Sequence, residues 1–299
     1  MSLNIDLCGI EFKNPVIAAS GTFGFAKEFE DYIDLDRLGG VSSKGLTLNK
    51  NLGNPGIRIY ETPSGIMNSI GLQNPGVEHF IDNELPLMLQ RDFVTMANLG
   101  GHTVEEYVEG ARKLDKTDLR MIELNISCPN VKKGGMAFGT DPVKAAEVVS
   151  KVREVTDKVL FVKLSPNVGH IGDFARIARD NGADGISLVN TFNALAIDIR
   201  SRKPVFANKT AGLSGPAIKP IALRMVNEVA KAVDLPIIGM GGITNYVDAI
   251  EFIMAGASAI EVGTGNFLKL DLMTDIIDGM EKFMEEENIK SLDEIRYII

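Results

Sequence analysis

The chain has 299 residues and a formal net charge of −9, from 31 basic and 40 acidic residues. This acidity argues against a nucleic-acid partner, because an acidic protein repels phosphate backbones. The length suits one large barrel or two modest domains, and we expect a single domain over residues 1–299, without an internal repeat or linker.

Eight strand-like apolar runs occur along the chain. Most lack the polar–apolar alternation of half-exposed strands, as expected for parallel strands covered on both faces. The runs are Val16–Ala19, Gly40–Lys44, Phe93–Ala97, Met121–Ile126, Val159–Leu164, Gly185–Asn190, Pro236–Met240 and Ala259–Gly263. Each is followed by a helical pattern. Eight such units predict an α/β fold of the (β/α)₈ TIM-barrel type.

Helix boundaries carry their own signals. Asp141 followed by Pro142 predicts an N-cap and a first helical residue, and Gly182 marks a helix end. The alternative architecture, a doubly wound open sheet, has a G-x-G-x-x-G fingerprint after its first strand, and this chain lacks it.

Two connections are unusually long. Gly45–Gly76 follows the second strand and Thr191–Pro216 follows the sixth. Both contain several large apolar residues, so we expect ordered lids or small insertions rather than disordered linkers. Both leave the carboxyl end of the barrel, where barrel enzymes keep their active sites.

Glycine turns end the last two strands, as Gly241-Gly242 and Gly263-Thr264-Gly265. Turns at these two places form the usual phosphate site of the barrel fold, because glycine lets backbone N–H groups approach an anion. The alternative is that these glycines serve tight-turn geometry alone.

Two lysines lie in or at the end of apolar strands. Lys163 sits within VLFVKLSP and Lys44 closes the second strand. A buried lysine is costly unless paired, so both are candidates to meet an anionic ligand. Each could instead extend its charge to the rim.

Neutral amides and one thiol complete the candidate site. Asn68, Asn125, Asn130 and Asn190 offer donors and acceptors that suit a planar ligand such as a pyrimidine, although any one of them could be a turn residue. Cys128 follows the fourth strand between such amides. It is either a buried structural cysteine or a base, if its surroundings lower the thiol pKa. No histidine spacing indicates a metal site.

The number of cysteines and the lengths of the apolar runs indicate the cell compartment that we expect for this protein. Cys8 and Cys128 are too few for a four-cysteine zinc or iron–sulfur site and fit a reducing cytoplasm, with a Cys8–Cys128 disulfide as the alternative. No apolar run reaches the roughly 18–20 residues that span a bilayer, and the N-terminus lacks signal-peptide features. We expect a cytoplasmic protein without a membrane partner.

Several longer segments resemble one enzyme family. They include GNPGIRIYETPSGIMNSIGLQNPG, LNISCPNVKKGG, VKLSPNV, IIGMGGI and VGTG, within a match from about residue 9 to residue 265. These segments resemble dihydroorotate dehydrogenase, class 1B (NAD-linked) catalytic subunit. The resemblance implies FMN-dependent oxidation of (S)-dihydroorotate to orotate in pyrimidine (UMP) biosynthesis, with Cys128 as the catalytic base.

The resemblance also implies the ligand contacts. One FMN per chain would contact Ala19, Ser20, Gly21, Ser43, Lys44, Asn98, Asn125, Lys163, Val189, Gly215, Gly241, Gly242, Gly263 and Thr264. The substrate would contact Lys44, Asn68, Ile70, Gly71, Leu72, Asn125, Asn130, Asn190 and Thr191.

The partners implied are a homodimer of this chain and an electron-transfer subunit with FAD and a 2Fe–2S cluster, in a heterotetramer of two catalytic and two electron-transfer subunits. Four alternatives remain at this stage. They are a fumarate-linked class 1A enzyme, a dihydropyrimidine dehydrogenase-like subunit, a flavin-dependent RNA-modifying protein and a non-catalytic FMN electron-transfer module.

Overall fold

A computed structural model of the chain describes residues 2–127 and 138–299. Its central feature is a closed barrel of eight strands, in which each barrel strand pairs in parallel with the next and the last pairs with the first. The strands are β3 (Val16–Ala18), β4 (Gly40–Ser42), β7 (Val94–Leu99), β8 (Met121–Asn125), β9 (Val159–Lys163), β10 (Gly185–Leu188), β15 (Ile237–Met240) and β16 (Ala259–Val262). The predicted barrel is confirmed, and every predicted strand is present.

Side chains on the barrel strands alternate between the interior and the surrounding helices. On β8, Ile122 and Leu124 belong to the large core shared with the helices, whereas Met121 belongs to a separate apolar cluster inside the barrel. Both faces of the strands are therefore covered, which explains their nearly continuous apolar sequences.

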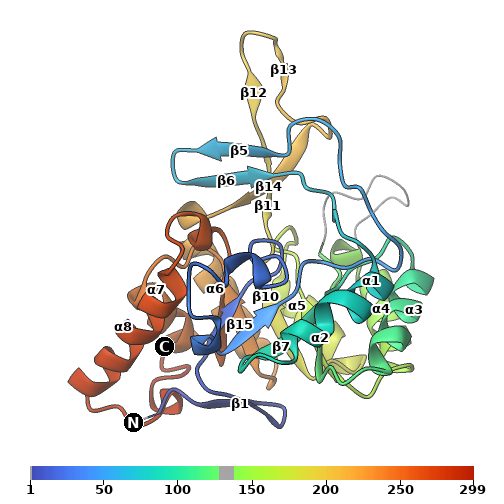
Figure 1. The fold of residues 1–299 in the computed structure, drawn as a ribbon. Helices are drawn as coiled ribbons and strands as arrows, with labels where there is room; N and C mark the ends of the chain where they lie inside the picture. The colour runs from blue at the N-terminus through green and yellow to red at the C-terminus, as the bar shows by residue number, and fades with distance from the viewer. Residues whose placement is uncertain (1, 128–137) are drawn as a thin grey trace.

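Among the described residues, six α-helices of nine or more residues surround the barrel, with α7 and α8 on one side and α3 and α4 on the other in Figure 1. They are α3 (Val104–Asp115), α4 (Pro142–Arg153), α5 (Ile171–Asp180), α6 (Lys219–Ala232), α7 (Tyr246–Met254) and α8 (Leu272–Glu286). Asp141 caps α4 by accepting hydrogen bonds from the N–H groups of Val143 and Lys144, as predicted. Gly182 takes a φ of 98° just after α5.

The prediction of a helical segment after every strand is wrong for the first strand. Only two 3₁₀ turns, η1 (Lys27–Phe29) and η2 (Leu35–Arg37), follow β3 among the described residues. Gly21, Gly24 and Ala26 all have positive φ there, which interrupts any continuous helix. In the connection from β4 to β7, three short helical segments stand where one helix was expected. They are α1 (Val77–His79), the π-helical η3 (Phe80–Glu84) and α2 (Leu85–Met88).

The two long connections build one antiparallel sheet, in the order β11–β14–β6–β5. The connection after β4 supplies β5 (Ile59–Thr62) and β6 (Gly65–Asn68), and the connection after β10 supplies β11 (Phe192–Leu195) and β14 (Thr210–Ser214). A hairpin of β12 (Ile197–Asp198) and β13 (Lys203–Pro204) projects beyond this sheet (Figure 1). The expected insertions are therefore ordered, and they are joined to each other.

An N-terminal hairpin closes the opposite end of the barrel, and Figure 1 shows β1 there. It consists of β1 (Ile5–Leu7) and β2 (Ile10–Phe12). Cys8 and Gly9 turn the chain with φ values of 56° and 78°, as a two-residue hairpin turn of type I′ requires. Leu7, Ile10 and Phe12 then pack inside the barrel with a set of inward-facing strand residues: Ile17, Met96, Met121, Phe161, Ile238, Met240 and Ala259.

We predict that Phe12→Ala lowers the free energy of unfolding by about 3–5 kcal/mol, because it removes a ring that is 1% exposed and leaves a cavity in the barrel. Phe267→Ala, at a ring that is 54% exposed, is the matched control and should cost less than about 0.5 kcal/mol. Urea unfolding measures both changes. A loss below about 1 kcal/mol for Phe12→Ala would show that the hairpin is not part of the core.

Candidate functional site

A cavity of about 240 Å³ opens at the carboxyl end of the barrel, between the strand ends and the inserted sheet. Strand ends supply Ala19, Lys44, Asn125 and Lys163, and the inserted sheet covers it with residues such as Asn68. The cavity therefore lies where the fold class keeps its catalytic residues.

One side of the cavity is formed by the glycine turns after β15 and β16. Gly241 and Gly242 have φ values of 126° and 84°, and a Cβ on Gly242 would approach the carbonyl oxygen of Gly215 to 2.9 Å. The backbone N–H groups of Gly242, Thr264 and Gly265 donate to no other described residue. Free N–H groups on adjacent turns make a cradle for an anionic group such as phosphate.

A partly buried cluster of ion pairs holds the first of these turns in place. Lys219, at the start of α6, contacts Asp248 at 2.6 Å and Glu251 at 2.6 Å. Asp248 in turn accepts hydrogen bonds from the backbone N–H and the hydroxyl of Thr244, at 2.8 and 2.9 Å. Thr244 lines the cavity just after the glycine turn, so the turn is tied to α6 and α7.

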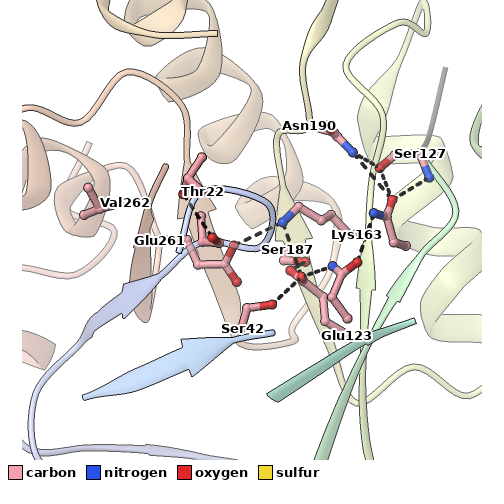
Figure 2. Close-up of polar contacts among 12 residues, drawn as sticks. Thr22, Ser42, Glu123, Ser127, Lys163, Ser187, Asn190, Glu261 and Val262 are labelled. Carbon is pink, nitrogen blue, oxygen red and sulfur yellow. Dashed lines mark hydrogen bonds and ion pairs between the residues drawn. The ribbon is translucent and has the colours of Figure 1, made fainter. Parts of the chain in front are cut away.

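The inner end of the cavity is formed by Lys163, whose charge is paired inside the barrel. Its ammonium lies 3.3 Å from Glu123 on β8 and 3.1 Å from Glu261 on β16, between the two carboxyl groups in Figure 2. Lys163 is 4% exposed, and both glutamates are fully buried.

The pKa values of the three groups follow from burial and from their mutual charges. Burial disfavours the charged form of Lys163, but the two carboxyl groups outweigh it and raise the lysine pKa. Burial likewise opposes ionisation of Glu123, but Lys163 and hydrogen bonds from Ser187 and Asn98 lower its pKa. Burial and the charge of Glu123 raise the pKa of Glu261 to about 8.

A chain of amides forms another wall. The amide of Asn125 donates to the side-chain oxygen of Asn98 at 3.2 Å, and its oxygen accepts from the hydroxyl of Ser127 at 2.8 Å. Asn190 donates to the same hydroxyl at 2.7 Å (Figure 2). The phenol of Tyr107 donates to the backbone carbonyl of Asn125. These bonds fix the amides and orient their polar edges.

Lys44 supplies a second positive charge to the cavity. Its ammonium makes no ion pair with any residue that the structure describes, and it is half-buried at the cavity wall. Burial is the main cause that lowers its pKa. An ammonium left without a partner in a concave site is suited to an anionic ligand.

Most of the predicted site residues meet at this cavity. Those that line it are Ala19, Ser20, Gly21, Lys44, Asn68, Ile70, Gly71, Leu72, Asn125, Lys163, Val189, Asn190, Thr191, Gly215, Gly241, Gly242, Gly263 and Thr264. Ser43 and Asn98 are fully buried and do not line it. Cys128 and Asn130 lie outside the described residues.

Several residues of the site were missed from the sequence. Glu123 and Glu261 are charged residues within the apolar runs MIELN and AIEV, which is the same signal that drew attention to Lys163. Ser214 and Thr244 could not be recognised, because a short hydroxyl side chain next to a strand end resembles an ordinary turn residue.

Cys8, the other cysteine, lies far from this site. It is exposed in the N-terminal hairpin turn, at the other end of the barrel, and its thiol is free. Partial burial and the nearby charges of Asp184 and Asp6 raise its pKa to about 11, so this thiol is protonated at neutral pH.

Neither a bilayer span nor a metal cluster is found in the part of the chain that the structure describes. No helix there is long and apolar enough to cross a membrane. No group of three or more His, Cys, Asp or Glu side chains there is arranged to hold a metal ion.

Comparison with known proteins identifies the family. A family model described as Dihydroorotate dehydrogenase matches residues 2–284. The protein named dihydroorotate dehydrogenase B (NAD(+)), catalytic subunit, of Petrotoga mobilis is 58% identical over 99% of this chain and 98% of its own length. Proteins of the same name from Thermoanaerobacter pseudethanolicus and Geotalea uraniireducens are each 52% identical, over 99% and 98% of this chain and 98% and 96% of their own lengths.

These matches span nearly the whole barrel, including the strand ends and glycine turns around the cavity. They confirm the family that the sequence segments resembled. The chain belongs to the dihydroorotate dehydrogenase family.

Proposed function

We propose that this chain oxidises (S)-dihydroorotate to orotate, with one FMN bound in the cavity and with NAD as the final electron acceptor. One observation carries the proposal. Free backbone N–H groups, the buried ammonium of Lys163 and the unpaired ammonium of Lys44 all border the same cavity. A phosphate, an electron-accepting ring and a substrate carboxylate are the ligand parts that such a cavity suits.

The residues around the cavity fit FMN. The N–H groups of Gly242 and Thr264 would hold its phosphate, and Lys163 would face its ring. When bound, the flavin accepts a hydride equivalent from the substrate. The other proposed contacts come from the strand ends and from Gly215. They are Ala19, Ser20, Gly21, Ser43, Lys44, Asn98, Asn125, Val189, Gly241 and Gly263.

Substrate binding would use the opposite wall and the inserted sheet. Lys44 would pair with the carboxylate of dihydroorotate, and fixed amides such as Asn125 and Asn190 would hydrogen bond to the edges of the ring. The full set of proposed contacts adds Asn68, Ile70, Gly71, Leu72, Asn130 and Thr191. This wall would contribute to the rate mainly by holding the substrate ring in place against the flavin.

Proton removal is the remaining step. We assign it to Cys128, which would take a proton from one ring carbon while the adjacent carbon gives up a hydride, so that the bond between them becomes double. Ser127, the residue before Cys128, is hydrogen bonded to Asn125 and Asn190 at the cavity wall. These bonds tie the last described residue before Cys128 to the amides that line the cavity, which supports the assignment.

A partner subunit is part of the proposal. The relatives are named as catalytic subunits of NAD(+)-dependent enzymes, a name that implies a second, electron-transfer subunit in those enzymes. We propose that this chain forms a homodimer and joins two electron-transfer subunits that carry FAD and a 2Fe–2S cluster. Two cysteines are too few to bind such a cluster within this chain.

We predict that the purified chain takes up one FMN and that anaerobic dihydroorotate bleaches its absorbance, whereas dihydrouracil, which lacks the carboxylate, does not. Cys128→Ala should keep the FMN and slow the bleaching at neutral pH by about 100-fold or more, because it removes the base. Stopped-flow absorbance measures both rates.

The matched control is Cys8→Ala, at the exposed thiol on the other end of the barrel, which should bleach at the wild-type rate. A chain that binds no FMN would disprove the proposed function. Equal rates in Cys128→Ala and wild type would disprove the base assignment alone.

We further predict that Lys44→Met weakens orotate binding by about 10- to 100-fold, as expected when a charged hydrogen bond to a carboxylate is lost. Lys50→Met, at an exposed lysine six residues further on, is the control and should bind orotate normally. Titration of FMN-loaded protein with orotate, followed by flavin absorbance, gives the dissociation constants. A change below threefold in Lys44→Met would place the carboxylate elsewhere.

A further inference from the structure

The buried cluster below the cavity holds more acid than base. Its members are Glu123, Lys163 and Glu261, which come from three different strands and point into the barrel interior (Figure 2). If all three were ionised, the cluster would carry one uncompensated negative charge, shielded from water and directly below a cavity suited to anions. A charge in such a place is very unfavourable.

Hydrogen bonding distinguishes the two carboxyl groups. Glu123 accepts from the hydroxyls of Ser42 and Ser187, at 3.0 and 2.7 Å, and from the amide of Asn98, in addition to Lys163. Glu261 receives only the ammonium of Lys163 on one oxygen, and its other oxygen has no partner among the described residues. Donors stabilise the ionised form of a carboxyl group, so Glu123 is built to be the anion.

Glu261 is therefore the carboxyl group that keeps a proton at neutral pH. The raised pKa of this group agrees with the geometry, since burial and the charge of Glu123 both oppose its ionisation. Among the described residues, the ionisable groups that act on Glu261 are Glu123, which raises its pKa, and Lys163, which lowers it.

We propose that Glu261 is a positioning residue that acts through Lys163: as a neutral acid it fixes the ammonium below the flavin site and leaves the cluster without net charge. The proposal rests on the proposed function, because it concerns the charge that Lys163 presents to the bound flavin. Glu261 does not itself line the cavity.

A change of charge with pH follows from this arrangement. At neutral pH the cluster is neutral, with one anion, one cation and one neutral acid. Above about pH 8 Glu261 loses its proton and the cluster becomes negative, which disfavours the additional negative charge of a reduced flavin. The reduced flavin should then bind less tightly relative to the oxidised form.

The first test measures the midpoint potential and the dissociation constant of FMN from pH 6 to pH 10. Glu261→Gln should match wild type within about twofold at pH 7, because glutamine mimics the neutral acid. At pH 9.5 the ratio of the affinity for reduced flavin to the affinity for oxidised flavin should be roughly tenfold lower in wild type than in Glu261→Gln. A tenfold change corresponds to one pKa unit. If the midpoint potentials and dissociation constants of wild type and Glu261→Gln changed with pH in the same way over the whole range, the proposal would be overturned.

The second test does not depend on flavin. Between pH 4.5, the ordinary pKa of a glutamate, and about pH 8, the folded chain keeps a proton that the unfolded chain loses. Stability of wild type relative to Glu261→Gln is therefore lost as pH rises through this window and is constant above it. The Tm of Glu261→Gln minus the Tm of wild type should therefore increase by about 3 °C or more between pH 5 and pH 8.

Two control variants sharpen this comparison. Glu287→Gln, at an exposed glutamate, should show a constant Tm difference. Glu123→Gln should lower Tm more than Glu261→Gln at pH 7, because it places an amide where several donors converge. A flat difference for Glu261→Gln, or a larger loss than for Glu123→Gln, would contradict the proposal. Failure of the chain to bind FMN would instead disprove the proposed function and leave this second test decisive.

Discussion

The closed interior of the barrel is the constraint on which the rest of the structure depends. Inward-facing side chains from eight strands share this space, and whatever occupies one level determines what can lie above it. At the amino end, Phe12 and the rest of the N-terminal hairpin fill the interior with apolar groups. The next level contains Glu123, Lys163 and Glu261 with their hydroxyl and amide partners. The cavity opens above them.

This order explains how an acidic protein presents a cavity suited to anions. The chain carries a net charge of −9, yet the cavity is bordered by two ammonium groups and by free N–H groups of glycine turns. The carboxylate that balances Lys163 lies below the ammonium, inside the barrel, and the lysine lines the cavity above. Local placement of charge, rather than net charge, decides what the cavity attracts.

Much of the fold was predictable, because buried parallel strands and amphipathic helices leave strong periodic signals. Lys163 was recognisable for the same reason: a charge within an apolar strand requires a partner. Its partners were not identified, since Glu123 and Glu261 lie 40 residues before it and 98 residues after it, and the strand order of a barrel does not reveal which inward-facing side chains meet at the same level.

The inserted sheet shows the same limit. Asn68 on β6 pairs with Gly212 on β14, 144 residues away, and no local pattern encodes such a pairing. The missing helix after β3 has a local cause instead. Glycines and an alanine with positive φ replace it, and the backbone conformation of Ala26 could not be read from its residue type, because alanine ordinarily favours helices.

A crystal structure of the chain with FMN and orotate tests the central claim most directly. We predict that the flavin phosphate accepts hydrogen bonds from the N–H groups of Gly242 and Thr264, that the flavin ring lies against Lys163, and that orotate lies between the ring and the wall formed by Asn125 and Asn190. A phosphate bound away from both glycine turns, or a ring out of reach of Lys163, would contradict it.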